Sequence, residues 1–258
     1  MPIVDVNAEG LETLTRKEVK RFWSVLGQTV TAPVMTALLY LLVFGQVMEG
    51  RVEVYPGVGY TQFLIPGLIM MSVIQNAFAN SSSSLTQAKI MGNLVFVLMA
   101  PIAAWEMFAA YLGASLLRSG LVAVVLYCAT WPFVHLPIHS FATLLGMFLL
   151  AGGSLAVIGV IAGILATKFD HLASFQNFLI LPASFLSGVF YSIHSLPEFW
   201  YTVSHFNPFF YMIDGFRHGF LGIGDVPVWQ CFAWTGGTFV VLSAICLRML
   251  VTGYRLRP

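Results

Sequence analysis

The chain has 258 residues, of which 58% are hydrophobic and 9% are charged, and its formal net charge is +1. Soluble domains carry about 25% charged residues, so this composition excludes an ordinary soluble protein and predicts an all-α protein that crosses a membrane several times. The small net charge, with no basic run away from the membrane flanks, indicates that no nucleic acid is bound. We treat residues 1–258 as one membrane domain.

The first element that we expect is a helix over residues 11–26. Its apolar side chains form a loose stripe, and four basic residues lie mostly off that stripe: Arg16, Lys17, Lys20 and Arg21. This pattern is typical of an amphipathic helix that lies on the inner leaflet with its basic side at the headgroups. The alternative is the ordinary positive flank of a first span.

A membrane-spanning helix needs about 20 predominantly apolar residues. Six stretches meet this requirement, and we expect a span in each: 28–48, 61–81, 104–130, 140–166, 174–194 and 229–251. Pro66 and Pro182 are tolerated where neighbouring helices satisfy the freed carbonyls. Gly159 and Gly163, four apart in the fourth span, predict close helix packing. The stretch between the second and third spans contains Lys89, Gly92 and Asn93, and we expect it to be cytoplasmic.

The positions of Lys and Arg near the span ends predict the orientation. An even number of spans places both termini on one side, and that side has nine basic residues: Arg16, Lys17, Lys20, Arg21, Lys89, Lys168, Arg248, Arg255 and Arg257. The other side has Arg51 and Arg217. We therefore expect both termini to be cytoplasmic.

Polar side chains inside the spans are the next candidates for function. Arg118 lies near the middle of the third span, where a lone charge costs about 3 kcal/mol on insertion scales. It must face another helix, a cavity or a dimer interface, and it is either part of a substrate path or a structural charge. The amides of the second span (Gln75, Asn76 and Asn80) and of the fifth (Gln176 and Asn177) either bridge helices or line a path.

Residues 205–222 are too interrupted to span the membrane and too apolar to lie in water. Asn207–Pro208 interrupts the helical hydrogen bonding, and a block rich in aromatic residues follows, with Asp214 and Arg217 within it. We expect this segment at the membrane surface, just before the last span. Asp214 and Arg217 are three apart, a spacing that predicts a local ion pair at the water edge.

No motif for catalysis is present in the sequence. Without a Gly-rich phosphate loop the chain cannot hydrolyse ATP alone. His135 and His139 flank Pro137 in a predicted turn, which does not suit a metal pair. The three cysteines, Cys128, Cys231 and Cys246, lie in or beside apolar runs and are interpreted as small core residues. We expect neither an enzyme nor a cofactor or metal site in this chain.

Taken together, these features resemble the type-2 ABC exporter permeases, and the similarity covers the chain from about residue 16. The matching segments are PGLIMMSVIQNAFANSSSS at 66–84, GNLVFVLMAPI at 92–102, FLSGVFYSIHSLPEFW at 185–200, NPFFYMIDGFRHGFLG at 207–222 and DVP at 225–227. The chain looks closest to the small bacterial subgroup that contains drug-export-like and nodulation-factor-export-like permeases.

The resemblance implies a homodimer in the bacterial inner membrane, paired with two copies of a separate ATPase that binds ATP and Mg²⁺. Residues 85–100 would be the coupling helix that docks into the ATPase, and the N-terminal helix would also touch it. The coupling residues implied are Lys89, Gly92, Asn93, Val95 and Phe96. In the family an acidic residue usually follows the Gly-x-Leu of this segment, whereas Val95 and Phe96 occupy the region here.

The resemblance also implies that residues 195–222 form short re-entrant helices that close the exit at the outer face. The gate residues would be Asn207, Pro208, Tyr211, Asp214 and Arg217. The path would run between the two copies, mainly along the second and fifth spans. Its candidate residues are Gln75, Asn76, Phe78, Arg118, Gln176 and Phe178.

The predicted function is therefore the permease subunit of an ATP-driven exporter. The substrate class stays open between amphipathic, lipid-like, drug-like and saccharide molecules. Two other functions are a membrane scaffold or lipid-organising protein without transport, and an ion channel. A scaffold would have no ATPase partner, and a channel would need a polar stripe along one helix.

Overall fold

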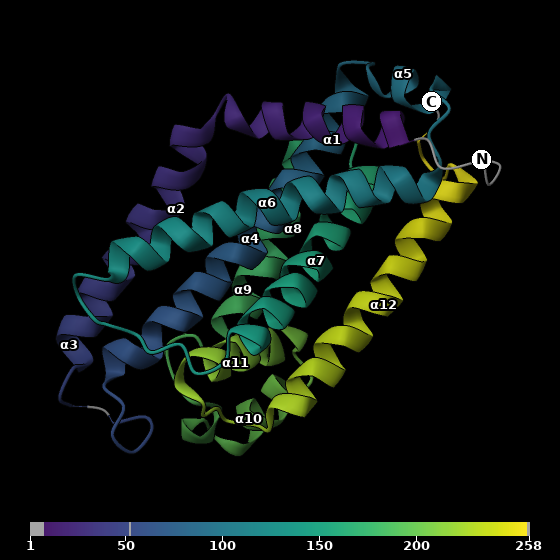
Figure 1. Cartoon of the computed structure of the whole chain (residues 1–258). Helices are drawn as coiled ribbons and strands as arrows, with labels where there is room; N and C mark the ends of the chain where they lie inside the picture. The colour runs from purple at the N-terminus through teal and green to yellow at the C-terminus, as the bar shows by residue number, and fades with distance from the viewer. Residues whose placement is uncertain (1–7, 52, 257–258) are drawn as a thin grey trace.

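The computed structural model describes residues 8–51 and 53–256. These residues fold almost entirely into helices and contain no β-strand, apart from an isolated bridge between Tyr55 and Val58. Figure 1 shows the long helices packed side by side in a tilted bundle, with short helices across both of its ends. The apolar composition is thus organised as the predicted all-α membrane bundle.

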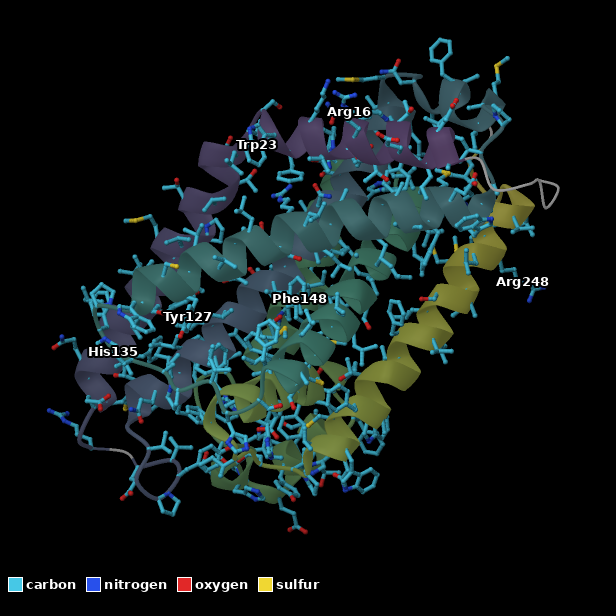
Figure 2. All side chains as sticks on the ribbon, viewed as in Figure 1. Arg16, Trp23, Tyr127, His135, Phe148 and Arg248 are labelled. Carbon is cyan, nitrogen blue, oxygen red and sulfur yellow. The ribbon has the colours of Figure 1, made fainter. Side chains whose placement is uncertain are left out.

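Helix α1 (Ala8–Trp23) lies across one end of the bundle. Leu14 and Phe22 on its apolar side are buried, whereas Arg16 and Trp23 are exposed and point away from the bundle (Figure 2). A two-residue turn separates α1 from the next helix. The amphipathic pattern of the sequence therefore corresponds to a helix of its own rather than to an extension of the first span.

Five helices of the described chain are long and apolar enough to cross a membrane. The first is a continuous helix that contains a wide π turn, η1. The five are α2–η1–α3 (Leu26–Tyr40, Leu41–Gly45 and Gln46–Met48), α4 (Tyr60–Ile90), α6 (Ala104–Thr130), α7 (Phe141–Leu165) and α12 (Val228–Thr252).

The fifth predicted span is not a single helix over 174–194. The helical segment begins at Phe169 and ends at Phe185, as α8 (Phe169–Phe175), the π turn η2 (Gln176–Ile180) and α9 (Leu181–Phe185). The chain then turns at Gly188, whose φ of +71° is a conformation that favours glycine. At 1.5 Å per residue this segment is about 25 Å long, which is short of the ~30 Å hydrocarbon core.

Helix α4 is the centre of the core and packs most extensively on α7. It continues nine residues past the expected end at residue 81, because Ser81–Ser84 do not terminate it. The Ser81 hydroxyl instead donates to the carbonyl of Ala156 on α7 over 2.7 Å. A Cβ added at Gly159 would lie 2.1 Å from Ser81 Oγ and 2.6 Å from Phe78 O. The predicted close packing at this glycine is confirmed.

The α1 end of the bundle is closed by a second apolar cluster. Helix α5 (Leu94–Met99) contributes Leu94, α1 contributes Leu14, and Leu250 and Leu256 come from the end of the described chain. The first and last described segments therefore lie at the same end of the molecule (Figure 1).

The opposite end holds the 3₁₀ turn η3 (Ile193–Ser195) and two helices, α10 (Glu198–His205) and α11 (Pro208–Leu221). Helix α11 packs on α7, α12 and α4, so it is part of the core rather than a surface segment. At this end Cys128 is exposed in the last turn of α6 and Cys231 on α12 is buried, whereas Cys246 is buried in the apolar cluster of the α1 end.

Candidate functional site

Arg118 contacts two amides of α4. Its Nη1 donates to Asn80 Oδ1 and its Nη2 to Asn76 Oδ1, each over 3.4 Å. Its Nε is buried and has no hydrogen-bond partner in the described chain. Among the described residues no carboxylate forms a salt bridge with Arg118. The positive charge of Arg118 is therefore stabilised by amide oxygens of α4.

Arg21 reaches the same amide from α1. Its Nη2 donates to Asn80 Oδ1 over 2.8 Å and to the Asn80 carbonyl over 2.9 Å. Its Nε lies 3.2 Å from Glu18 Oε2. The guanidinium of Arg21 therefore turns inward to α4, whereas that of Arg16 points away from the bundle. We call Glu18, Arg21, Asn76, Asn80 and Arg118 the arginine cluster.

Glu18 is the member of the arginine cluster that the sequence analysis missed. Its side chain is fully buried, accepts a hydrogen bond from Ser84 of α4, and lies 3.5 Å from Lys17 Nζ. A signal was present, because Leu14, Glu18 and Phe22 recur every four residues and so share one helix face. A carboxylate on the buried face of a surface helix needs a partner below it.

A recess of about 280 Å³ lies between α2, α4 and the η2–α9 segment. Gln75, Asn76 and Gln176 line it together with apolar and aromatic side chains. Gln75 Nε2 is buried without a hydrogen-bond partner in the described chain. The structure thus brings three of the six path candidates together in one recess.

The other three path candidates lie outside this recess. Phe78 is buried and stacks on Phe175 of α8, with ring centroids 5.7 Å apart. Phe178 is 83% exposed on η2. Arg118 is connected to the recess through Asn76, which contacts both.

The segment between α4 and α6 turns sharply at Gly92, whose φ is +72°. Lys89, just before the turn, donates to the carbonyls of Ile164 and Ala166 over 2.7 and 2.9 Å. It therefore caps the C-terminus of α7, where a cation is favourable. Asn93 is exposed, as are the apolar side chains of Val95 (46%), Phe96 (73%) and Met99 (79%) on α5.

At the opposite end, α11 and the loops at 53–58, 188–193 and 224–226 form a structure that we call the cap. Asn207 caps α11, because its Oδ1 accepts from Phe209 N over 3.1 Å, and Pro208 follows at the first position of the helix. Asn207 Nδ2 also donates to Ala183 O over 2.7 Å, and the Tyr211 hydroxyl donates to His205 O over 3.0 Å. These contacts fix α11 against α9 and α10.

The predicted pair of Asp214 and Arg217 is present, with Nη1 and Oδ1 3.5 Å apart. Both side chains are fully buried, so the expected position at the water edge is wrong. Arg217 also donates to Gly188 O over 2.7 Å, and its guanidinium carbon lies 3.8 Å from the centre of the Phe63 ring. The guanidinium is held by a carbonyl, a carboxylate and an aromatic face at once.

Asp225 is a cap residue that the sequence analysis named only within the matching segment DVP at 225–227, without a role. It accepts hydrogen bonds from the Tyr55 hydroxyl over 2.8 Å and from Ile193 N over 2.9 Å. Its own N–H, with that of Val226, donates to Asp214 over 3.0 and 3.1 Å. Burial is the largest cause that raises the pKa of Tyr55, so its hydroxyl stays a proton donor to Asp225.

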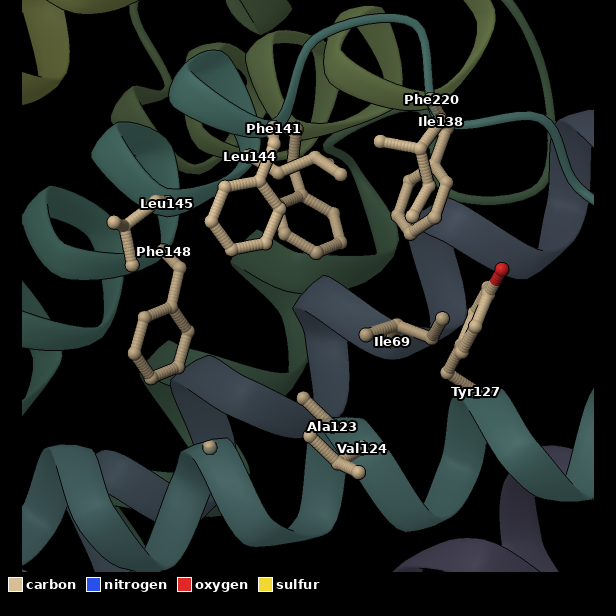
Figure 3. Close-up of a pocket in the computed structure, with 12 residues that line it drawn as sticks. Ile69, Ala123, Val124, Tyr127, Ile138, Phe141, Leu144, Leu145, Phe148 and Phe220 are labelled. Atoms are coloured by element: carbon tan, nitrogen blue, oxygen red, sulfur yellow. The ribbon is translucent and has the colours of Figure 1, made fainter.

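A separate pocket with apolar and aromatic lining lies between α6, α7 and α11 (Figure 3). Tyr127 and Phe220 form one wall, with stacked rings whose centroids are 5.7 Å apart. Phe148 and Ile69 line other parts of it. None of the residues predicted for the path, the coupling segment or the gate lines this pocket.

Comparison with known proteins gives one consistent result. The family model described as ABC-2 type transporter matches residues 9–221. The chain is 37% identical over 247 residues to the inner membrane transport permease YadH of Escherichia coli (strain K12), with 96% of each chain covered. It is 28% identical over 239 residues to Nodulation protein J of Sinorhizobium fredii (strain NBRC 101917 / NGR234), covering 87% of this chain and 80% of that protein. The matched residues include the arginine cluster, the recess and α11.

Proposed function

Because the chain belongs to the ABC-2 type transporter family and is a multi-pass transport permease of the inner membrane, we propose that it forms the path of an ATP-driven exporter. Family membership implies association with an ABC ATPase subunit, and in this proposal that partner binds ATP and Mg²⁺. Two permease copies and two ATPase copies make the complex. The permease forms the path and changes conformation, and the ATPase hydrolyses ATP.

The exposed apolar side chains of α5 are the observation that carries the proposal. Phe96 and Met99 are 73% and 79% exposed at the end of the bundle where basic residues gather. A groove runs between α1 and α5, and Phe96, Lys17 and Glu9 are among its lining residues. An exposed apolar ridge beside a charged groove suits a protein partner. We therefore assign the coupling contact to Val95 and Phe96, with Gly92 and Asn93 forming the turn that presents them.

The six-span count is part of the same proposal. Five helices have full spanning length, and the α8–η2–α9 segment would be the sixth, shortened crossing. Leu14 and Leu256 share one apolar cluster, which suits an even number of crossings and two cytoplasmic termini. The bend after α9 and the following α10 and α11 then form the re-entrant part.

The cap would be the outer gate of this path. Its buried pair of Asp214 and Arg217 ties α11 to the turn at Gly188, directly after α9. A movement of the α8–η2–α9 segment would therefore be transmitted to α11 through the contacts of Arg217. Asn207, Pro208 and Tyr211 hold the other end of α11 in register with α9 and α10.

The recess between α2, α4 and η2–α9 would be one half of the path, completed by the second copy. Its lining mixes the amides of Gln75, Asn76 and Gln176 with Tyr40 and Met71. Such a surface suits a cargo with both apolar and polar parts. Lipid-like, drug-like and saccharide molecules all meet this description.

The first test replaces the exposed aromatic of α5. The permease is purified together with an ATPase encoded beside it, as wild type and as Phe96→Asp. We expect the charge to abolish co-purification and stimulated ATP hydrolysis, because it would be buried unpaired in the contact. Phe133→Asp is the matched control, since Phe133 is 59% exposed at the opposite end and should leave both readouts unchanged.

A second comparison separates the coupling contact from the fold. Lys89→Met removes the cap of α7 and should lower the melting temperature of the permease while the ATPase still co-purifies. Equal ATPase activity of the Phe96→Asp and wild-type complexes would refute the coupling role of α5. A permease that retains no ATPase in any variant would favour the scaffold or channel functions instead.

A further inference from the structure

We propose that Arg21 and Arg118 form a binding site for a phosphate-type anion at the junction of α1, α4 and α6. The anion is carried by the headgroup of an acidic lipid or is free phosphate. The inference rests on the arginine cluster itself and does not require the ATPase or export.

Two guanidinium groups meet at one neutral oxygen. Arg21 Nη2 lies 2.8 Å and Arg118 Nη1 3.4 Å from Asn80 Oδ1. Like charges at such separations repel, and the repulsion grows as water is removed. A group with several anionic oxygens placed against both guanidinium groups would turn this repulsion into attraction.

The charges of the cluster do not balance. Arg21 and Arg118 of the cluster are cationic and Glu18 is anionic, and Lys17 just outside the cluster also contacts Glu18. Glu18 is already shared by Lys17 and Arg21, whereas Arg118 forms no salt bridge with any described residue. Buried charges are normally paired, so the cluster lacks negative charge on the Arg118 side.

Arg118 also has hydrogen-bond donors to spare. A guanidinium carries five N–H donors, and the two side-chain contacts of Arg118 are at 3.4 Å, beyond the usual 2.7–3.2 Å. Its Nε is buried without a partner in the described chain. Phosphate oxygens suit this fork because they accept two parallel hydrogen bonds from one arginine.

The two arginines are partly exposed, whereas the residues that hold them in place are buried. Asn80 and Ser115, joined by a hydrogen bond of 3.1 Å, are almost fully buried, which fixes the Asn80 side chain that both arginines contact. Arg118 remains partly exposed even though it faces α4, and the Arg21 side chain is 23% exposed. Basic pockets between membrane helices on the cytoplasmic side are typical sites for acidic headgroups. The position of Arg21 at the end of the surface helix α1 gives such a headgroup an approach.

The test measures lipid binding to the purified, delipidated permease by native mass spectrometry. Phosphatidylglycerol is titrated against wild type, Arg118→Gln and Arg248→Gln, with phosphatidylcholine as the neutral lipid. We expect Arg118→Gln to bind phosphatidylglycerol about tenfold more weakly or worse, since a charged hydrogen bond is lost. Arg248 is exposed and points away from the bundle (Figure 2), so Arg248→Gln should bind as wild type does.

Two further measurements identify the source of the anion and provide a second Arg118 variant. Inorganic phosphate that displaces the lipid from wild type identifies free phosphate as a ligand, and its failure to do so identifies the headgroup. Arg118→Lys keeps the positive charge but loses the two parallel donors of the guanidinium. Its affinity for phosphatidylglycerol should therefore lie between those of wild type and Arg118→Gln. If Arg118→Gln does not fold, Arg118→Lys is compared with wild type in its place. Equal phosphatidylglycerol binding by wild type and the Arg118 variants, or equal binding of the two lipids by wild type, overturns the proposal.

Discussion

Arg217 is the largest fully buried side chain in the described part of the chain. Its partners come from α11, the turn at Gly188 and α4, so one guanidinium holds three segments that are far apart in sequence. Removing one member of a buried ion pair leaves the other charge unpaired, which costs about 3–5 kcal/mol. The stability of the cap therefore depends on this residue.

We expect Arg217→Met to lower the free energy of unfolding by about 3–5 kcal/mol, because Asp214 would stay buried without its cation. Thermal unfolding of the purified permease in detergent is the measurement. Arg51→Met is the control, since Arg51 is exposed and its loss should cost less than about 0.5 kcal/mol. Equal melting temperatures for the two variants would contradict the role given to Arg217.

At the scale of elements, the contact of α4 with α7 is set by glycine. At Gly159 the backbone of α4 and Ser81 Oγ approach too closely for any side chain. Such approaches let two membrane helices gain van der Waals contact and a hydrogen bond together. Gly113 on α6 differs, because a Cβ there would meet no atom within 4 Å.

Gly159→Ala should destabilise the permease by about 1–3 kcal/mol or more, because α4 and α7 must separate to admit the methyl group. Gly113→Ala should be neutral or stabilise by up to about 1 kcal/mol, since alanine favours the helix and meets no obstacle. Melting temperatures of both variants check the pair. A Gly159→Ala variant as stable as Gly113→Ala would show that the two helices do not pack as described.

The same elements show which features the sequence can predict. Spacing alone predicted the pair of Asp214 and Arg217, and the glycine spacing predicted the close approach at Gly159. The inward turn of Arg21 was missed because its acceptor, Asn80, lies 59 residues away, and helix periodicity says nothing about such partners. The break after Phe185 was missed because hydropathy stays high through 174–194 whether or not the backbone continues as a helix.

At the scale of the whole molecule, the two ends of the bundle are built differently. The α1 end presents exposed apolar side chains on α5 and basic residues on α1, whereas the cap buries the charges of Asp214 and Arg217 in a network of backbone and side-chain partners. The distribution of Lys and Arg in the sequence predicts that the α1 end is cytoplasmic, and this orientation stays a prediction. The sequence did not predict that α11 lies within the core, because its polar residues suggested a surface position.

The three cysteines divide between these environments. Cys128 is exposed in the last turn of α6, and Cys231 and Cys246 are buried. With cytoplasmic termini, a maleimide that cannot cross the membrane should label intact spheroplasts at Cys128 and should not label Cys128→Ser. If Cys128 is labelled only in inside-out vesicles, the orientation of the chain is the reverse of the one predicted.

Because one of the three cysteines is exposed and two are buried, the native chain can be labelled at a single position for spectroscopy. One fluorophore or spin label per chain attaches beside the cap without any cysteine being removed or introduced. In a two-copy assembly the pair of labels would report a single distance between the cap ends of the two chains. Changes in that distance upon addition of nucleotide would follow the opening of the complex in real time.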